Sequence, residues 1–183
     1  MPDKPLLFMK PPTAFITAGQ SIQLPPGASS LHHEVELGVV IGSLAKNVSV
    51  DKAMAHVAGY CLALDMTDRK LQDELKAKGH PWFLAKGFDT SCPVSEFIEA
   101  EKILDPHKLT LWLEVNGVLR QRGSTSDMIY PIPDLISYLS RWVTLEPGDL
   151  VLTGTPEGVG PVSKGDKITC GLDGVTEMVF SIE

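Results

Sequence analysis

Apolar and β-branched residues fill one run of the chain, Val35–Ile41, which predicts a strand that is largely buried. Tyr60–Leu64 is a second apolar run of strand length, and Leu109–Val115 is a third. The third run leads into Asn116-Gly117 and then into Val118–Gln121. Because Asn-Gly between two such runs is a strong signal of a two-residue turn, we expect a β-hairpin here.

Shorter apolar runs predict further strands, at Leu6–Met9, Leu150–Thr153, Lys167–Cys170 and Glu177–Ile182. The Gly-, Pro- and Ser-rich connection between residues 13 and 30 has room for one more, near Ser21–Leu24. For Trp82–Phe88 the sequence indicates a loop or a strand.

Helices are expected at three places. The clearest is Thr67–Gly79, which opens with a threonine N-cap, places two leucines one turn apart and closes on a glycine. Asp51–Val57 and Ile132–Trp142 are the other two. The sum is a mainly β fold with a few outer helices, an α+β class, in which residues 1–183 form a single domain.

The composition is that of an ordinary globular protein, since 43% of the 183 residues are hydrophobic and 21% are charged. The formal net charge of −7 argues against a nucleic-acid partner, because binding phosphates needs a basic surface. No apolar run approaches the ~20 residues of a membrane-spanning helix, so no membrane partner is expected either. The three cysteines are far apart and lack a Cys-x-x-Cys spacing, which favours a reducing compartment over disulfides or zinc.

Two glutamates flank Val35 at the start of the buried strand. Side chains alternate along a strand, so Glu34 and Glu36 lie on one face, where two carboxylates repel each other and lose hydration. A divalent cation between them offsets both the repulsion and the lost hydration. Asp65 is the best third ligand because it stands where an apolar strand ends, although alone it would more simply cap the next turn. Taken together, the three carboxylates predict a metal site.

Three carboxylates without cysteine or an obligatory histidine favour a hard cation over zinc. Mg²⁺ or Mn²⁺ fits best, with Ca²⁺ as a further option. Such an ion keeps coordination positions open, and the adjacent carboxylate and keto oxygens of a 2-oxo acid would fill two of them. The ion would then polarise the carbonyl group.

Several residues near these ligands have two possible roles. Lys86, which stands among apolar residues, would steady a carboxylate or a developing enolate, or would snorkel from a loop. Arg69 and Gln72 on the predicted helix would clamp a carboxylate and position water, or would occupy the helix surface. His32 shares the strand face of the glutamates, where it would act as a base or merely begin the strand.

A predicted strand runs into a rigid Gly/Pro loop at residues 152–161. Its backbone N–H groups and the Thr155 hydroxyl suit an anion, although a tight turn between closing strands also explains the loop. The glycine spacing matches neither a phosphate-binding loop nor a dinucleotide fingerprint. His33-Glu34 does not complete a zinc-protease motif, because Leu37 stands where the second histidine is required.

Seven short motifs follow one another along the chain: Phe8-Met-Lys10-Pro, His32-His-Glu-Val-Glu-Leu-Gly38, Leu64-Asp65-Met-Thr with Arg69 and Gln72, Pro81-Trp with Leu84-Ala-Lys86, Ser91-Cys-Pro93, Val115-Asn-Gly117, and Leu152-Thr-Gly-Thr-Pro156 with Gly158-Val-Gly-Pro161. In this order they resemble the fumarylacetoacetate hydrolase family. The resemblance covers Leu6 to Ile182 and is nearest to the family's acylpyruvase and oxaloacetate decarboxylase branch.

This resemblance implies the family's mixed β-sandwich or β-roll, usually as a homodimer, with Mg²⁺ or Mn²⁺ held by Glu34, Glu36 and Asp65. It also implies two catalytic residues, Gln72 and Lys86, and three substrate-binding residues, Lys10, Arg69 and Thr155. The substrates of the branch are 2-oxo acids. Acylpyruvates are cleaved at a C–C bond, and oxaloacetate is decarboxylated or tautomerised, with an enolate at the metal as the common step. Relatives occur in mitochondria and in the cytosol.

Family members carry an upstream segment with a first strand and a short lid helix, whose His and Glu activate the hydrolytic water. The sequence begins after the point where that segment would end, and its first residues contain neither a signal-peptide core nor an Arg-rich transit helix. We therefore expect the metal and substrate residues without the hydrolytic pair. The resemblance predicts a metal-dependent acylpyruvate hydrolase and oxaloacetate decarboxylase. A family isomerase or tautomerase, and a binder of metal and 2-oxo acid without turnover, remain as alternatives.

Overall fold

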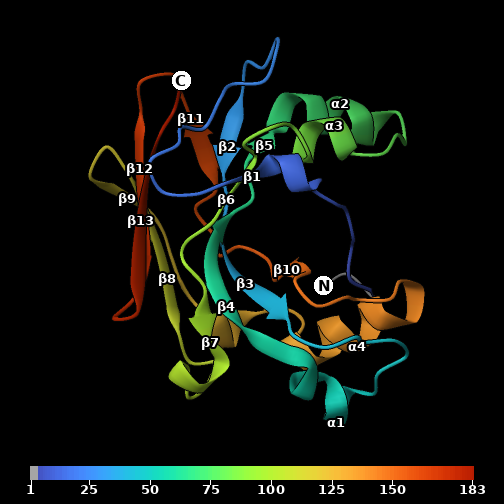
Figure 1. The fold of residues 1–183 in the computed structure, drawn as a ribbon. Helices are drawn as coiled ribbons and strands as arrows, with labels where there is room; N and C mark the ends of the chain where they lie inside the picture. The colour runs from blue at the N-terminus through green and yellow to red at the C-terminus, as the bar shows by residue number, and fades with distance from the viewer. Residues whose placement is uncertain (1–3) are drawn as a thin grey trace.

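The outer sheet of the molecule has the strand order β13-β12-β8-β9 and lies along one side (Figure 1). Its strands are β8 (Thr110–Val115), β9 (Val118–Ser124), β12 (Lys167–Leu172) and β13 (Thr176–Ser181). All neighbouring strands in it are antiparallel. The expected hairpin is confirmed: Asn116 and Gly117 have φ of 52° and 75°, as a type I′ turn requires. These elements come from a computed structural model that describes residues 4–183.

The central sheet has the order β10-β3-β4-β7. Its strands are β3 (Val35–Ile41), β4 (Val57–Leu64), β7 (Ile98–Glu99) and β10 (Leu150–Leu152). The strand expected at Val35–Ile41 is confirmed, and six of its seven residues are buried. One hydrophobic core joins the two four-stranded sheets, with Leu37 and Leu62 from the central sheet and Leu113 and Phe180 from the outer sheet. The packing of both faces explains why this run is apolar apart from Glu36.

Two smaller sheets connect the ends of the long strands. One is antiparallel with the order β11-β2-β5, formed by Gly160–Val162, Leu31–His33 and Thr67–Asp68. The other pairs β1 (Phe15–Ile16) with β6 (Cys92–Pro93) in parallel. Glu34 is the single residue between β2 and β3, so the chain passes from one sheet into the next at this glutamate.

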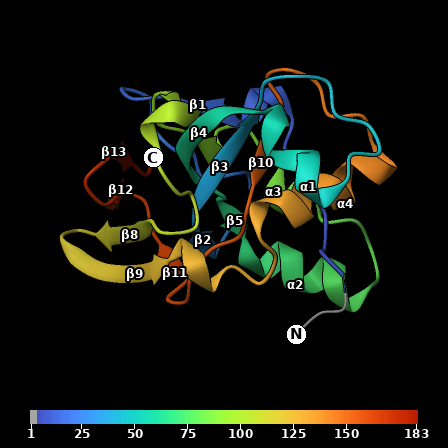
Figure 2. The same cartoon turned by 90° about the horizontal axis from the view of Figure 1, so that it is seen from below.

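The helices lie at two ends of the central strands. α2 (Arg69–Ala77) and α3 (Phe83–Lys86) lie together at one end, and α1 (Val50–Ala53) and α4 (Ile132–Trp142) at the other (Figures 1 and 2). Short 3₁₀ turns complete the chain at Pro12–Ala14, Met54–His56, Ala100–Lys102 and Thr125–Asp127. Within residues 4–183, no helix has the length and apolar character needed to cross a membrane.

The structure corrects the predicted start of α2. Thr67 belongs to β5, and its hydroxyl donates to the carbonyl of Asp65 at 3.1 Å. Asp68 is the N-cap instead, since its carboxylate accepts the backbone N–H of Leu71 at 3.2 Å. Both residue types are good caps, and the pairing of Thr67 with β2 decides between them.

Three other predicted elements differ from the structure. Trp82–Phe88 is neither loop nor strand throughout, because the helix α3 occupies Phe83–Lys86. Leu6–Met9 forms no strand; these four apolar residues are 39–76% exposed and have no ladder partner among the described residues. Near Ser21–Leu24 only Ile22 forms a β-bridge, to Ile182.

Candidate metal centre

Three carboxylates meet at the junction of β3 and β4. Antiparallel pairing sets Val35 opposite Leu64, which brings Glu34 and Glu36 beside Asp65, the residue after β4. One carboxylate oxygen from each lies within 4.8 Å of the other two. The three residues are 8%, 4% and 1% exposed. The cluster predicted from the sequence is therefore formed by the fold, and it is buried.

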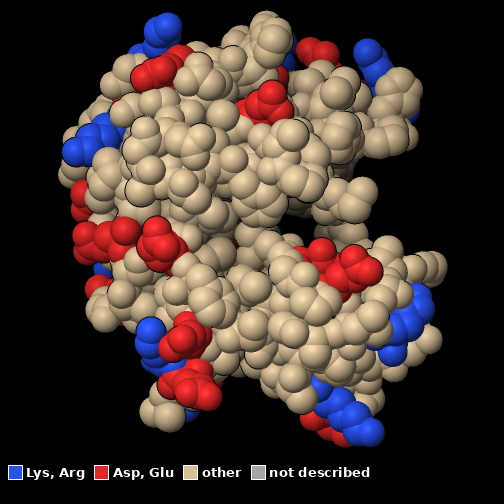
Figure 3. Space-filling model, viewed as in Figure 1, with Lys and Arg blue, Asp and Glu red and all other residues tan. Residues whose placement is uncertain are grey.

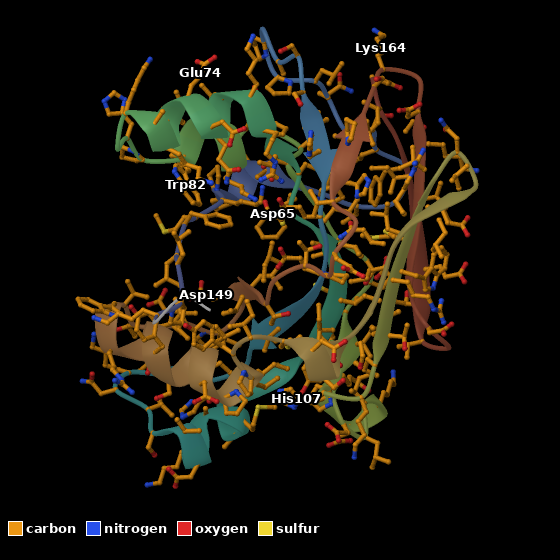
Figure 4. The ribbon with its side chains drawn as sticks, turned by 180° about the vertical axis from the view of Figure 1, so that it is seen from behind. Asp65, Glu74, Trp82, His107, Asp149 and Lys164 are labelled. Carbon is orange, nitrogen blue, oxygen red and sulfur yellow. The ribbon has the colours of Figure 1, made fainter. Side chains whose placement is uncertain are left out.

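The cluster lies near a notch between the α2/α3 end and the α4 end of the molecule. The notch is visible in the space-filling view, with acidic side chains on its lower lip (Figure 3). From behind, Asp65 and Trp82 are seen on the α2/α3 side of the opening and Asp149 on the opposite side (Figure 4). Asp65, one residue of the cluster, is thus seen on the α2/α3 side of this opening.

Lys86 is inserted between two of the carboxylates. Its Nζ lies 2.9 Å from Glu34 Oε2 and 2.5 Å from Asp65 Oδ2, and the side chain is 2% exposed. The aromatic ring of Phe8 covers the same ammonium, with the ring centre 4.7 Å from Nζ. Of the two roles open for Lys86, the snorkelling lysine is therefore wrong. The sequence does not identify Phe8 as a site residue, because its apolar run predicts a strand.

Two further cations reach the cluster. Lys10 Nζ lies 2.8 Å from Asp65 Oδ1 and donates to the carbonyls of Met66 and Lys86. Burial lowers the pKa of Lys10, and the nearby charge of Asp65 opposes that shift. Arg69, from the first turn of α2, forms an ion pair with Glu34.

Gln72 is connected to the cluster through Arg69, whose guanidinium donates to Gln72 Oε1 at 2.6 Å. Gln72 is 4% exposed and is the one buried residue of α2. The interpretation of Arg69 and Gln72 as residues of an ordinary helix surface is therefore wrong. The first turn of α2 faces the carboxylates.

Glu36 is the carboxylate that no cation contacts in the described chain. Its Oε2 accepts the backbone N–H of Gly154 at 2.6 Å, from the Gly/Pro loop after β10. Burial raises the pKa of Glu36 to about 8, and the negative charges of Asp65 and Glu34 add to this effect. The loop N–H thus binds an anion, as the sequence suggested, but the anion is a carboxylate of the chain itself.

The donor set fits a divalent hard cation. All three ligands are carboxylates, which Mg²⁺ and Mn²⁺ prefer over nitrogen or sulfur donors. Opposite oxygens on such an ion are roughly 4.2 Å apart, so a spacing within 4.8 Å closes with small side-chain shifts. Asp65 Oδ1 is already paired with Lys10, whereas Glu36 contacts no cation among the described residues and its pKa is raised by burial, so Glu36 is the ligand with unmet demand for positive charge.

Thr155 and His32 lie beside the cluster in different ways. The Thr155 hydroxyl donates to the carbonyl of Val35 at 2.9 Å, which holds the Gly/Pro loop on the strand between the two glutamates. His32 Nε2 lies 3.1 Å from the Ser30 hydroxyl. Burial lowers the pKa of His32, and the charge of Arg69 adds to this effect. Thr155 therefore stays a candidate binding residue, whereas the contacts of His32 are those of a residue that begins a strand.

The sequence pattern of the family described as fumarylacetoacetate (FAA) hydrolase C-terminal matches residues 1–183. The chain belongs to this family. Oxaloacetate tautomerase FAHD1, mitochondrial, from Bos taurus is 56% identical over 182 residues, which are 100% of this chain and 82% of that relative. The oxaloacetate decarboxylase, mitochondrial, of Dictyostelium discoideum is 48% identical over 100% of this chain and 84% of its own length. The resemblance found in the sequence motifs is thereby confirmed.

Solved structures of the family confirm the fold. The crystal structure of fumarylpyruvate hydrolase from Pseudomonas aeruginosa, in complex with Mn²⁺ and pyruvate, superimposes with a TM-score of 0.91. It is 37% identical, and the match covers 96% of this chain and 77% of that one. The mainly β fold with outer helices, predicted from the sequence, is thus the fold of the fumarylacetoacetate hydrolase family.

Proposed function

We propose that this chain is a divalent-metal-dependent enzyme of 2-oxo acids and that it catalyses the keto–enol tautomerisation of oxaloacetate. One observation carries the proposal: a buried cluster of three carboxylates lies in contact with the ammonium of Lys86 and the guanidinium of Arg69. Such a site combines a place for a metal with fixed positive charge for an anionic substrate. The tautomerase named among the relatives supports oxaloacetate as that substrate.

The cations differ in exposure, and this difference suggests their roles. The side chain of Arg69 is 24% exposed, against 6% for Lys10 and 2% for Lys86, so Arg69 would bind a carboxylate of the arriving substrate. Lys86 lies deepest and would donate a hydrogen bond to the oxygen on which the enolate charge develops. Gln72, oriented by Arg69, would hold a second substrate oxygen or a water molecule.

The carboxylates and the remaining polar groups complete the site. Glu34, Glu36 and Asp65 would hold Mg²⁺ or Mn²⁺, which when bound would polarise the keto group. Lys10 would keep Asp65 in place while the negative charge of the substrate is stabilised. Thr155 would contact the substrate from the Gly/Pro loop.

Decarboxylation of oxaloacetate and hydrolysis of acylpyruvates form the second candidate function, because both share an enolate with tautomerisation. The decarboxylase from Dictyostelium and the fumarylpyruvate hydrolase from Pseudomonas favour them. Hydrolysis also needs a base that activates water. Tautomerisation needs only the enolate and the movement of a proton, without cleavage of a C–C bond, so it makes the smallest demand on the site.

A single set of assays separates these reactions. The purified chain would be given oxaloacetate with and without Mn²⁺, and enol absorbance and CO₂ release would be followed together, with acetylpyruvate as a second substrate. Metal-dependent loss of enol without CO₂ supports tautomerisation, and CO₂ or pyruvate release supports the second candidate. Glu36→Gln should weaken Mn²⁺ binding strongly and abolish turnover, whereas Glu74→Gln, on the exposed side of α2, should change neither. Tight oxalate binding without any turnover would instead make the chain a non-catalytic binder and sink the proposal.

Assembly and location are two further parts of the proposal. We propose a homodimer located in mitochondria, as the names of the relatives from Bos taurus and Dictyostelium suggest for location. A cytosolic enzyme is the alternative. Sedimentation equilibrium tests the dimer, and fractionation of cells that express the natural gene tests the compartment.

A further inference from the structure

Gln121 is fully buried in β9, a strand whose other side chains are exposed or half-buried. Its Oε1 lies 2.8 Å from His33 Nδ1 and accepts the backbone N–H of Val35 at 3.2 Å. Its Nε2 donates to Thr155 Oγ1 and to the carbonyl of Pro156, both at 2.8 Å. A primary amide has two acceptor and two donor sites, so the hydrogen-bonding capacity of Gln121 is fully used.

These partners fix the direction in which the amide faces. The N–H of Val35 can only donate and the carbonyl of Pro156 can only accept, so the oxygen and nitrogen of Gln121 cannot be exchanged. Thr155 Oγ1 accepts from Gln121 while its own proton goes to the carbonyl of Val35. One lone pair of this hydroxyl is left, so Thr155 meets a ligand as a hydrogen-bond acceptor.

A β-bulge turns Gln121 inward. The pairing of β8 and β9 is regular up to Leu119, but the next pair joins Gln121 to Leu113, so Arg120 is an extra residue. Without the bulge, Arg120 would pair with Leu113, and Gln121 would lie opposite the half-buried Trp112. Bulges that redirect a side chain are frequent beside functional sites.

The loop that carries Thr155 packs directly on this bulge. A Cβ on Gly158 would lie 2.0 Å from the carbonyl oxygen of Arg120, and a Cβ on Gly123 would lie 2.5 Å from Pro156. Loop and strand therefore touch without room for a side chain at either glycine. The amide of Gln121 lies between these two contacts in the sequence of β9.

We propose that Gln121 is a positioning residue for the reaction. It holds the Thr155 loop at the carboxylate cluster and keeps the Thr155 hydroxyl turned to accept the O–H of the enol. The same amide is linked to the cluster in two ways. Val35, whose N–H it accepts, stands between the two glutamates. Thr155, to which it donates, follows Gly154, whose N–H donates to Glu36. The proposal rests on the proposed function for the identity of the ligand.

Gln121→Glu is the discriminating variant. It keeps an acceptor for Val35 and His33 but removes the two donors to Thr155 and Pro156. We expect kcat for oxaloacetate tautomerisation to fall roughly ten- to a hundredfold, because a displaced contact group costs about that much. The Mn²⁺ affinity should stay within about threefold, since the acceptor side that faces the ligand strand is kept. Amide hydrogen exchange should become faster at residues 153–158.

A matched control separates positioning from stability. Ser140 is equally buried; its hydroxyl accepts the N–H of Val48 and donates to the carbonyl of Ser137, both at 3.0 Å, next to α1 and away from the cluster. Ser140→Ala should lower the free energy of unfolding and leave kcat and the exchange of residues 153–158 unchanged. In a Thr155→Val background, Gln121→Glu should add little to the loss of kcat, because both changes remove the same contact.

Several outcomes overturn the proposal. A Gln121→Glu variant with the kcat of the wild type would overturn it. A double variant with Thr155→Val would also overturn it if its loss of kcat equalled the product of the two single losses. If the wild-type chain does not turn over oxaloacetate, the proposed function fails, and unchanged exchange of residues 153–158 in Gln121→Glu would then overturn the positioning role separately.

A second pair of variants covers the case in which Gln121→Glu does not fold. Gly158→Ala forces the loop off β9, whereas Gly165→Ala has similar positive φ but open space around its Cβ. Both substitutions strain the backbone at positive φ, but only Gly158→Ala displaces the loop. A Gly158→Ala variant as active as Gly165→Ala would overturn the proposal.

Discussion

The binding of Mn²⁺ should become tighter as the pH rises, because the metal must displace a proton from Glu36. Burial raises the pKa of this carboxyl to about 8 in the metal-free protein. When one proton leaves, the apparent Kd is multiplied by about 1 + 10^(8 − pH), which is roughly 30-fold at about pH 6.5 and roughly 1.3-fold at about pH 8.5. We therefore expect Mn²⁺ to bind about 25-fold more tightly at the higher pH.

Isothermal titration calorimetry in two buffers of different ionisation enthalpy measures both parts of this prediction. The number of protons released per Mn²⁺ should be close to one at about pH 6.5 and well below half at about pH 8.5. Glu74→Gln, which alters an exposed glutamate of α2, should leave the pH dependence unchanged. Glu36→Gln should bind weakly and release no proton. Wild-type binding of equal strength at both pH values, without proton release, would refute the assignment of the raised pKa to Glu36.

Three further predictions concern stability. The free energy of unfolding of the metal-free chain should fall as the pH rises from about 4.5 to 8, by up to about 1.4 kcal/mol per pH unit. The reason is that folded Glu36 keeps a proton that the unfolded chain has lost. Thermal melts that do not change over this pH range would contradict the prediction. Lys86→Met should destabilise the metal-free chain by about 3–5 kcal/mol in urea unfolding, since it leaves buried carboxylates without their partner. Added Mn²⁺ should recover part of this stability. A variant as stable as the wild type would show that the ion pair is not needed. Asp68→Ala should cost about 1 kcal/mol, and Ser49→Ala, at the start of α1 where no side chain caps the helix, should cost less; equal losses in the two variants would count against Asp68 as the cap.

Local signals were sufficient for much of the fold. The turn at Asn116-Gly117 needs positive φ at two successive residues, and Asn-Gly supplies both without help from distant contacts. The β-branched run Val35–Ile41 has few alternatives to a buried strand. The metal cluster could be predicted because two of its ligands, Glu34 and Glu36, are close neighbours in the sequence.

Other elements depend on tertiary contacts that no local pattern records. Leu6–Met9 has strand composition, but the described chain offers no strand beside it, and Phe8 packs at 6.1 Å from the ring of Trp82 and over Lys86 instead. Trp82–Phe88 is apolar at nearly every position, so it has no period that separates a strand from a short buried helix. The structure decides for α3, which directs Lys86 into the cluster.

Gln121 shows most clearly what cannot be predicted from the sequence alone. A regular register after Asn116-Gly117 would put Gln121 on the outer face, opposite Trp112, where a glutamine is an ordinary surface residue. The bulge at Arg120 that reverses its direction has no signature in a single sequence. Its partners at Val35 and Thr155 are 86 and 34 residues away, so neither could be inferred from spacing.

The charges of the cluster argue that it is maintained for chemistry rather than for stability. Buried ion pairs seldom stabilise a fold more than apolar side chains of similar size would. Here three carboxylates and the cations Lys10, Arg69 and Lys86 sum to zero when all are ionised, yet the cations contact Glu34 and Asp65 and leave Glu36 to a backbone N–H. A divalent ion would add two positive charges to this balance, and a substrate with two negative charges would restore it. Oxaloacetate carries that charge at neutral pH, so under the proposed function the buried charges would be complementary to metal and substrate together.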